Sequence, residues 1–512
     1  MAEESGEVAQ EEPEDQVKKT DAEILYLEVA ALTGIDPQTA DVLEERIERA
    51  RGGRATYVIT AAQNATPVFA AGWKTLLAYC LHNSAQLLVI PHRYKNPTSV
   101  WSAKAQSHDW WAKETRPYLF NRRVELNKHL VVLGDVMTQP TAKRPLEGFE
   151  TISAAKSAII GHPKLELLTI PTPGTRLPKI MTTTGAITKK NYIPSRAGKE
   201  GEFHHTFGAA VAEVVGDRFY LRQINMRRDG SFCDLLTEYD GDTRRTYRRV
   251  PALVMGDTHV EVIDPQVVKA TFTDDNSMVK VLRPEQLVWH DTFDGAAKNH
   301  HERGRPFHAY ARYKAGKANV EAELNRCFAL IDKVTPAATK NVFVASNHND
   351  FLREWVENTD PRRDPENCVF WAETYLAIVR SKNTAWTTAG ATVEDPFAHW
   401  GRKRLRTAAQ AVFLDRSQTY RIQGIEVSFH GDRGSGGNPG SRSVYDKIGS
   451  KTILGHTHAP GIQGGAYQVG TSSRLNLTYT VGQPSAWLHT HCVIYPNGKR
   501  CLLNVIEGKW RA

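Results

Sequence analysis

Two residues that could bind a metal ion follow a short apolar run in the middle of the chain. The run, residues 252–255, ends at Gly256 and is followed by Asp257 and His259. Residues two apart on an extended strand point to the same face, so these two side chains would lie together. A carboxylate and a neutral imidazole on one face form half of a site for a divalent metal ion. An Asp-x-His triplet is common by chance, so the prediction depends on whether further ligands follow.

Four more blocks of metal-binding side chains follow in the second half of the chain. Each places Asp, Asn or His directly after an apolar segment, where a strand would end: Trp289-His-Asp-Thr-Phe-Asp-Gly295, Ser346-Asn-His-Asn-Asp350, Phe429-His-Gly431 and Leu454-Gly-His-Thr-His458. The chain has 19 histidines, and an isolated histidine is usually a structural or surface residue. An ordered set of seven ligand-type residues is not expected by coincidence. The blocks therefore predict a metal site assembled from strand ends.

The five blocks in this order resemble the calcineurin-like metallophosphoesterases, and the resemblance covers roughly residues 250 to 500. The family pattern is Asp-x-His, Gly-Asp-x-x-Asp, Gly-Asn-His-Asp/Glu, His and Gly-His-x-His. The resemblance implies that this part of an α/β chain is a two-sheet β-sandwich flanked by helices. It also implies two divalent metal ions. Oxygen and imidazole ligands without a thiolate suit Mn²⁺, with Fe²⁺ or Zn²⁺ as alternatives.

The resemblance also assigns each ligand. Asp291 falls where the family has the carboxylate that bridges both ions. One ion would further bind Asp257, His259 and His458, and the other would bind Asn347, His430 and His456.

A catalytic role falls to His348, which follows the ligand position Asn347. By the resemblance, His348 would not bind metal but would protonate the leaving oxygen or stabilise charge on the phosphate. Asp350 could orient its ring, although the family places this acid one residue earlier, where the chain has Asn349.

The chain departs from the family pattern at two positions. His290 and Ser346 stand where the family has glycine, so each places a larger side chain close to the metals. These changes affect the expected loop geometry, but every ligand position is filled. Asp294 matches the last acid of the second block, and we expect it to support a ligand rather than to bind metal.

The first half of the chain predicts a separate N-terminal domain. Residues 1–20 are acidic with almost no large apolar side chains, which predicts a disordered tail. Residues 55–60 and 87–90 have the pattern of buried strands on either side of a helix, which implies a parallel, Rossmann-like pair. We expect an α/β domain with leading helices over residues 21–245, serving assembly or regulation, and a catalytic domain over residues 246–512.

Composition limits the remaining classes. Hydrophobic content of 41% and charged content of 24% fit a soluble globular protein. The sequence contains no apolar stretch long enough to predict a membrane span. Six scattered cysteines without a Cys-x-x-Cys pair indicate reduced thiols in a cytoplasmic protein. The net charge is +8, which favours a polyanionic partner.

Two basic clusters in the sequence could bind nucleic-acid phosphates. For the first cluster, a solvated linker is an equally good interpretation. The clusters consist of Arg244, Arg245, Arg248 and Arg249, and of Arg402, Lys403 and Arg404.

The whole layout also resembles the early DNA-transfer proteins of T-five-type tailed phages. It combines an acidic tail, an α/β domain that opens with residues 58–67, and a C-terminal metallophosphoesterase. That family is tied to degradation of host DNA soon after infection, which implies a metal-dependent DNase in the cytoplasm of the infected bacterium. DNA is the expected partner, and the N-terminal domain is a candidate for homo-oligomer formation and for contacts with host or phage proteins. A small-molecule or nucleotide phosphodiesterase and a DNA-transfer scaffold with vestigial catalysis are the alternatives.

Overall fold

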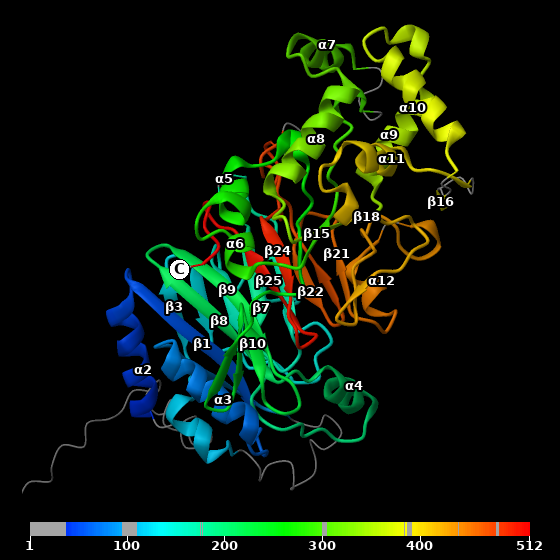
Figure 1. Cartoon of the computed structure of the whole chain (residues 1–512). Coiled ribbons are helices and arrows are strands. Elements are labelled where there is room, and N and C mark those ends of the chain that lie inside the picture. Colours follow the sequence, from blue (N-terminus) through cyan, green and yellow to red (C-terminus); the bar gives the residue numbers. More distant parts are fainter. Residues whose placement is uncertain are drawn as a thin grey trace, which may run out of the picture.

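The computed structural model describes residues 37–94, 110–174, 176, 178–299, 305–382, 385–386, 392–438, 440–477 and 481–511. Over these residues the chain is a mixed α/β protein with several sheets and surrounding helices (Figure 1), which confirms the predicted class. The acidic tail expected over residues 1–20 lies outside the described residues. None of the described helices is long and apolar enough to cross a membrane.

Four strands of the N-terminal half form a sheet in the order β2-β1-β8-β9. They are β1 (Arg54–Gln63), β2 (Gln86–His92), β8 (Gly208–Val215) and β9 (Arg218–Asn225). β1 and β2 are parallel, as the sequence predicts, and α3 (Ala70–His82) connects them. α2 (Pro37–Ala50) precedes this sheet, and a small sheet follows it, made of β10 (Phe232–Asp234), β11 (Thr237–Asp240) and β12 (Thr243–Thr246).

A six-stranded sheet carries the first three metal blocks at its strand ends. Its order is β18-β15-β14-β13-β24-β25. The strands are β13 (Ala252–Val254), β14 (Gln286–Trp289), β15 (Lys340–Phe343), β18 (Ala411–Phe413), β24 (Thr490–Ile494) and β25 (Arg500–Asn504). The first four of these are parallel to one another, so the loops after β13, β14 and β15 leave the same edge of the sheet.

Helices of the second half pack on this sheet or extend beyond it. One hydrophobic cluster joins the sheet to α5 (Pro265–Val268), α6 (Met278–Leu282), α8 (Val320–Val334), α9 (Asn347–Asn358), α10 (Cys368–Arg380) and α11 (Pro396–Arg404). In Figure 1, α10 and α7 (Pro306–Lys314) lie farthest from the sheets, with the short strands β16 (Ala385–Trp386) and β17 (Thr392–Val393) following α10 in the chain.

A ten-stranded sheet joins the two halves of the chain. Its order is β19-β20-β21-β23-β22-β6-β7-β5-β4-β3, and β22 pairs with β6 in antiparallel register at the centre. The N-terminal half supplies β3 (Arg123–Asn127), β4 (Leu130–Leu133), β5 (Ser157–Ile160), β6 (Glu166–Ile170) and β7 (Lys179–Thr183). The second half supplies β19 (Arg421–Ile422), β20 (Ile425–Glu426), β21 (Thr452–Leu454), β22 (Gly461–Gln463) and β23 (Ala466–Gln468). α4 (Arg196–His204) and α12 (Arg442–Asp446) lie outside the sheets.

The shared sheet bears on the expected division into domains. The boundary expected at residue 245 falls between β12 and β13, yet strands from both sides of it pair with each other. One hydrophobic core also contains residues of all three large sheets, including Ile59, Val254 and Ile453. Where the domains divide stays a prediction, but the two halves of the chain are not separate in space.

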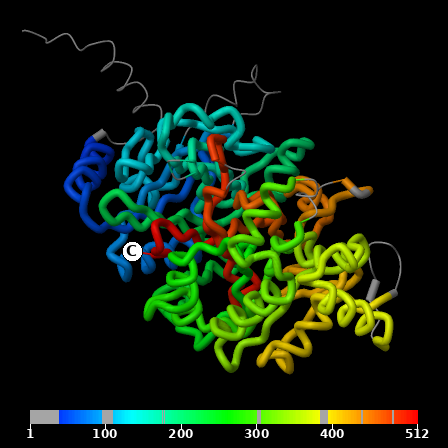
Figure 2. The backbone as a smooth tube through the Cα atoms, turned by 90° about the horizontal axis from the view of Figure 1, so that it is seen from above, coloured from blue at the N-terminus to red at the C-terminus, as the bar shows by residue number. Residues whose placement is uncertain are grey.

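The two halves repeat one topology. From the β6–β22 pair outward, the large sheet follows the order β6-β7-β5-β4-β3 in one direction and β22-β23-β21-β20-β19 in the other, with matching strand directions. The order β2-β1-β8-β9 likewise matches β14-β13-β24-β25 in direction. The strands β9 and β25 contact each other, because the N–H of Gln223 donates to Sγ of Cys501 at 3.3 Å. Figure 2 shows the C-terminal segment, in red, passing between the two halves. The molecule therefore has a pseudo-twofold arrangement, with the metal blocks in one repeat.

Candidate metal centre

Neighbouring parallel strands bring the first two blocks of the site together. β13 and β14 pair in parallel register, and the loops that follow them stay in contact. The backbone N–H of His259 donates to the carbonyl oxygen of Asp291 at 2.7 Å, and the N–H of Asp257 donates to that of Gly470 at 3.0 Å. His259 and Asp291 both have positive φ angles, of 46° and 40°, a left-handed conformation that is uncommon for residues other than glycine. The fold thus holds Asp257, His259 and Asp291 at one sheet edge.

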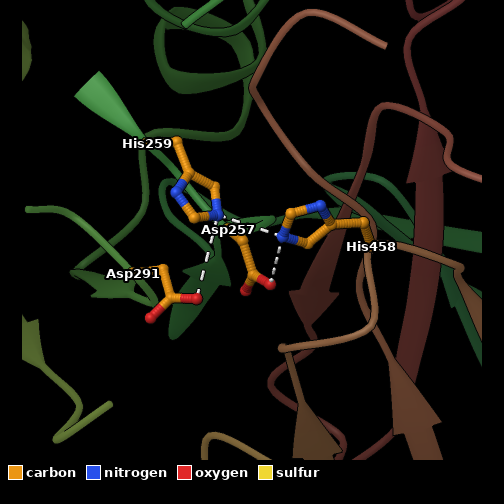
Figure 3. A group of neighbouring side chains, drawn as sticks. All are labelled: Asp257, His259, Asp291 and His458. Carbon is orange, nitrogen blue, oxygen red and sulfur yellow. Dashed lines mark hydrogen bonds and ion pairs between the residues drawn. The ribbon is translucent and has the colours of Figure 1, made fainter. Parts of the chain in front are cut away.

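Four buried side chains, Asp257, His259, Asp291 and His458, converge as Figure 3 shows, with ligand atoms within 4.8 Å of one another. Nε2 of His458 lies 3.2 Å from Oδ2 of Asp257 and 3.0 Å from Nε2 of His259. Nε2 of His259 lies 3.8 Å from Oδ2 of Asp291. Two imidazole nitrogens and two carboxylates that face one point match the ligand types of a divalent ion. These are the four residues expected around the first ion.

Of the residues expected around the second ion, His430 contacts the Asp291 carboxylate directly. Nε2 of His430 lies 3.1 Å from Oδ2 of Asp291, and the ring centroids of His430 and His456 are 5.2 Å apart. The backbone N–H of His456 donates to Oδ2 of Asp257 at 2.7 Å, which ties the last block to the first. Asn347 is the first residue of α9, directly after the loop that leaves β15. Asp291 therefore contacts residues of both groups, as a bridging carboxylate must.

Buried polar atoms of these residues lack hydrogen-bond partners within the described part of the chain. An unpaired buried polar atom costs about 1–3 kcal/mol, so several in one site need an explanation. Divalent ions fit the site, because all of these atoms are carboxylate or amide oxygens or imidazole nitrogens. The buried histidines and aspartates can therefore hold metal ions. The unpaired atoms are Oδ1 of Asp257, Asp291 and Asn347, and Nδ1 of His458.

The pKa values of Asp291, His430 and His259 are shifted more by the opposite charges of neighbouring residues than by burial. Burial would raise the pKa of Asp291, but the histidines His430, His348 and His259 hold it well below its usual value. Burial would lower the pKa of His430, but the charge of Asp291 raises it to about 9. For His259, burial is likewise outweighed, mainly by Asp294, and its pKa rises to about 9. Without metal, His430 and His259 therefore carry protons at neutral pH.

His348 lies next to the expected ligands, but its partner differs from the expected one. Its ring centroid is 4.6 Å from that of His259, and its Nδ1 lies 3.3 Å from the backbone oxygen of Asp294. Burial lowers the pKa of His348 to about 4. Asp350 instead accepts a hydrogen bond from Arg416 at 2.9 Å and pairs with Arg353 at 3.5 Å. The carbonyl of Asp294 thus takes the orienting position that the sequence assigned to Asp350.

The two departures from the family pattern have structural reasons. Nδ1 of His290 lies 3.3 Å from Nδ1 of His430, and His290 is fully buried. A Cβ at Gly455 would lie 3.1 Å from Cγ of His290 and 2.2 Å from Oδ1 of Asp257, so glycine at 455 makes room for histidine at 290. Ser346 is the N-cap of α9, and its Oγ accepts the N–H of Asn349.

Two supports of the site lie beyond what the ligand pattern indicates. Oδ1 of Asn349 accepts the Oγ1–H of Thr292 and the N–H of Phe293, each at 3.1 Å, which fixes the loop after Asp291. Arg416 pairs with Asp432 at 2.7 Å, and no motif surrounds it in the sequence. Asp294 has the expected role, because its Oδ1 lies 2.8 Å from Nδ1 of His259.

A pocket of about 360 Å³ adjoins the candidate centre at His430. Its polar lining includes Arg416, Asp432 and Arg433, and its apolar lining includes Phe429 and Tyr445. Arg433 is partly exposed and lies 3.7 Å from Asp350. The pocket therefore places two arginines, both paired with aspartates, beside the ligand position His430.

Most of the basic residues expected to bind DNA are exposed: Arg244, Arg245, Arg248, Arg402 and Lys403. Several of the seven also make contacts within the protein. Arg249 donates to the carbonyl oxygen of Pro284 at 2.7 Å, Arg402 pairs with Glu394 at 2.7 Å, and Arg404 pairs with Glu321 at 2.7 Å. None of the seven lines the pocket beside His430. Binding of DNA by these residues stays a prediction.

Fold and site together define a mixed α/β protein with a buried aspartate and histidine centre that can hold metal ions. Over 492 residues the chain is 30% identical to protein A1 of Escherichia phage T5, a match that spans 93% of this chain and 86% of that protein. The chain belongs to the family of this phage protein, which confirms the phage resemblance of the sequence. A scan against models of protein families finds no match, and no solved structure matches the chain.

Proposed function

We propose that the chain is a two-metal phosphodiesterase that cleaves DNA. The observation that carries the proposal is the clustering of Asp257, His259, Asp291, His430 and His458, with buried atoms that lack partners among the described residues. A purely structural cluster would not need unpaired polar atoms, since these destabilise the fold. The calcineurin-like ligand pattern supports the same assignment.

Each residue has a role in this proposal. One ion would bind Asp257, His259 and His458, the other would bind Asn347, His430 and His456, and Asp291 would bind both. When bound, such ions supply a nucleophilic water and positive charge that neutralises the phosphate. Asp294 orients the His259 ring through the 2.8 Å contact to Nδ1. The negative charge of a bound phosphate would raise the pKa of His348, so that it can carry a proton to the leaving oxygen.

The choice of DNA rests on the family and on charge. The relative is a phage protein, the net charge is +8, and Arg244, Arg245 and Arg248 are exposed. One observation favours a second candidate, a small-molecule phosphodiesterase: the pocket beside His430 has the size of common small-ligand sites, about 300–1,000 Å³. A scaffold with vestigial catalysis is less favoured, because all seven ligand positions are filled.

The test compares two substrates. Purified protein with Mn²⁺ is incubated with supercoiled plasmid and with bis(p-nitrophenyl) phosphate, with EDTA as the metal-free control. We expect metal-dependent cleavage of both substrates, and loss of both activities in Asp291→Ala. His129→Ala is the matched control, because His129 is exposed in the turn between β3 and β4. Hydrolysis of the chromogenic ester alone would favour the small-molecule enzyme, and no hydrolysis of either would contradict the proposal.

A further inference from the structure

A second pocket, with a volume of about 220 Å³, is lined by four cationic side chains. It shares no lining residue with the candidate metal centre, and both halves of the chain contribute to it. Lys164 comes from the N-terminal half, two residues before β6, and Lys451, Lys499 and Arg500 come from the second half, around β21 and β25. The polar side chains of His204 and Asn225 also line the pocket.

Arg500 is the most buried of these cations, with 5% of its surface exposed. Its Nη2 donates to the carbonyl oxygen of Gly465 at 2.5 Å, and its guanidinium lies 4.0 Å from the ring centroid of Tyr467. Its Nε and Nη1 are buried and lack a hydrogen-bond acceptor among the described residues. The positive charge of Arg500 is therefore only partly compensated inside the protein.

The other cations do not relieve this imbalance. Nζ of Lys164 donates to the carbonyl oxygen of Lys143, and Nζ of Lys451 donates to that of Gly498. In the described part of the chain, none of the four cations lies within 4.0 Å of a carboxylate oxygen. The nearby carboxylate of Asp446 accepts the N–H of Gly465 instead. The pocket thus gathers positive charge with no carboxylate in its lining, while Glu166 interacts with Lys164 and Asp446 interacts with His204 at longer range.

This group of cations destabilises the folded protein unless an anion binds in the pocket. A buried charge without a partner is destabilising, and charges of the same sign repel each other. Burial and the charges of Lys451 and Arg500 lower the pKa of Lys499 to about 8. A neighbouring pocket on the same sheet differs, because its lining contains Glu147, Glu150 and Glu166 together with Arg144 and Arg442. The pocket at Arg500 therefore differs from this neighbouring pocket, because no carboxylate lies in its lining.

We infer that the pocket at Arg500 binds a phosphate group, supplied either by a free phosphate or nucleotide or by the backbone of DNA. Ammonium and guanidinium groups are the side chains that recognise phosphate in proteins. The volume of about 220 Å³ is several times what one bound water molecule needs, which leaves room for a phosphate group. This site is independent of the metal centre and of catalysis, and it joins the two halves of the chain around one anion.

The test measures phosphate binding by the full chain in EDTA, so that bound metal ions cannot hold the probe. Isothermal titration calorimetry and thermal unfolding are recorded with pyrophosphate, with a mononucleotide, and with a single-stranded 12-mer that has no terminal phosphate. We expect saturable binding and an increased unfolding temperature with at least one probe. In the Lys451→Gln/Lys499→Gln double variant, we expect affinity for that probe to fall at least tenfold. Binding of the small probes would identify a free phosphate or nucleotide, and binding of the 12-mer alone would identify the DNA backbone.

The matched control is Lys269→Gln/Lys333→Gln, which removes the same charge from two exposed lysines outside the pocket. It should bind the probe as the wild type does. If the double variant in the pocket does not fold, Lys499→Gln alone replaces it, with the same expected direction. The inference would be overturned if no probe showed saturable binding. It would also be overturned if the control variant lost as much affinity for the probe as the pocket variant. If the wild-type protein binds phosphate but does not hydrolyse its substrates with Mn²⁺, the proposed function is contradicted and the inference about the pocket at Arg500 stands.

Discussion

At the scale of single residues, Gly455 limits what the centre can accommodate. A Cβ at this position would lie 2.2 Å from Oδ1 of Asp257, closer than real Cβ contacts. We predict that Gly455→Ala displaces the Asp257 carboxylate and weakens Mn²⁺ binding at least tenfold, as measured by calorimetry. Gly53→Ala is the control, because its Cβ would meet only the carbonyl oxygen of Ala50, at 3.3 Å. Unchanged Mn²⁺ affinity in Gly455→Ala would show that Asp257 is not a ligand.

The protons on His259 and His430 predict how metal affinity depends on pH. Both pKa values are raised to about 9 in the metal-free protein, although burial opposes this, because of the neighbouring Asp294 and Asp291. An ion that binds these rings must displace their protons. Apparent Mn²⁺ affinity should therefore rise from pH 7 to pH 9 and level off above it. Calorimetry in buffers of different ionisation enthalpy would measure the released protons, and a flat affinity between pH 7 and 9 would exclude these rings as ligands.

His348 and Asp291 should respond differently to substitution. His348 contacts a ligand ring but is not assigned as a ligand itself, so His348→Ala should keep Mn²⁺ binding and folding. Loss of a proton donor or charge stabiliser costs about 10²–10⁴-fold in rate. Asp291→Ala should lose metal as well, because Asp291 contacts residues of both groups. Activity of His348→Ala at the wild-type rate would contradict its assigned role.

The sequence alone predicts the ligands, because the ligand-type residues of each block lie within a few residues of one another. Asp257 and His259 are two residues apart in the sequence, and so are His456 and His458. Arg416 and Asn349 were not accessible as supports, since their contacts with Asp432 and Phe293 depend on the packing of distant loops. For the same reason, the sequence predicts that Asp350 orients His348, whereas in the structure Asp350 accepts a hydrogen bond from Arg416.

At the scale of elements, the β6–β22 pair determines how the chain can be divided. If the chain is cut after residue 245, each fragment exposes an unpaired strand at the middle of the large sheet. Exposed strand edges promote association of chains. We predict that fragments 37–245 and 246–511 aggregate or lack cooperative unfolding when expressed alone. Circular dichroism and size-exclusion chromatography test this, with the co-expressed fragments as the control. A soluble fragment 246–511 that unfolds cooperatively and binds Mn²⁺ would contradict the prediction.

The sequence indicated individual strands but not the large sheet. β1, β2, β4 and β14 are apolar runs with recognisable boundaries, and the β1–β2 direction follows from the helix between them. β22 and β23 contain only three residues each, too few for a periodicity to show. The partner of β22 is about 300 residues earlier in the chain, and no local pattern encodes such a pairing.

At the scale of the whole molecule, positive charge predicts the salt dependence of activity. Binding of Lys and Arg to DNA releases condensed counterions, so affinity for DNA falls steeply with salt. If DNA is the substrate, cleavage of plasmid should fall about 10³-fold or more between 50 and 200 mM salt for six or more phosphate contacts. Hydrolysis of bis(p-nitrophenyl) phosphate serves as the internal control and should change much less. Equal salt dependence of both rates would remove the support that the basic residues give to a DNA substrate.

The repeated topology has a consequence for how the molecule behaves on dilution. In a homodimer, the two subunits associate in proportion to their concentration, and they dissociate when the protein is diluted. Here the equivalent halves meet at β6 and β22 within one polypeptide, so their encounter is intramolecular. A single newly made chain can therefore complete the sheet that supports Asp257 and His458 without waiting for a partner molecule.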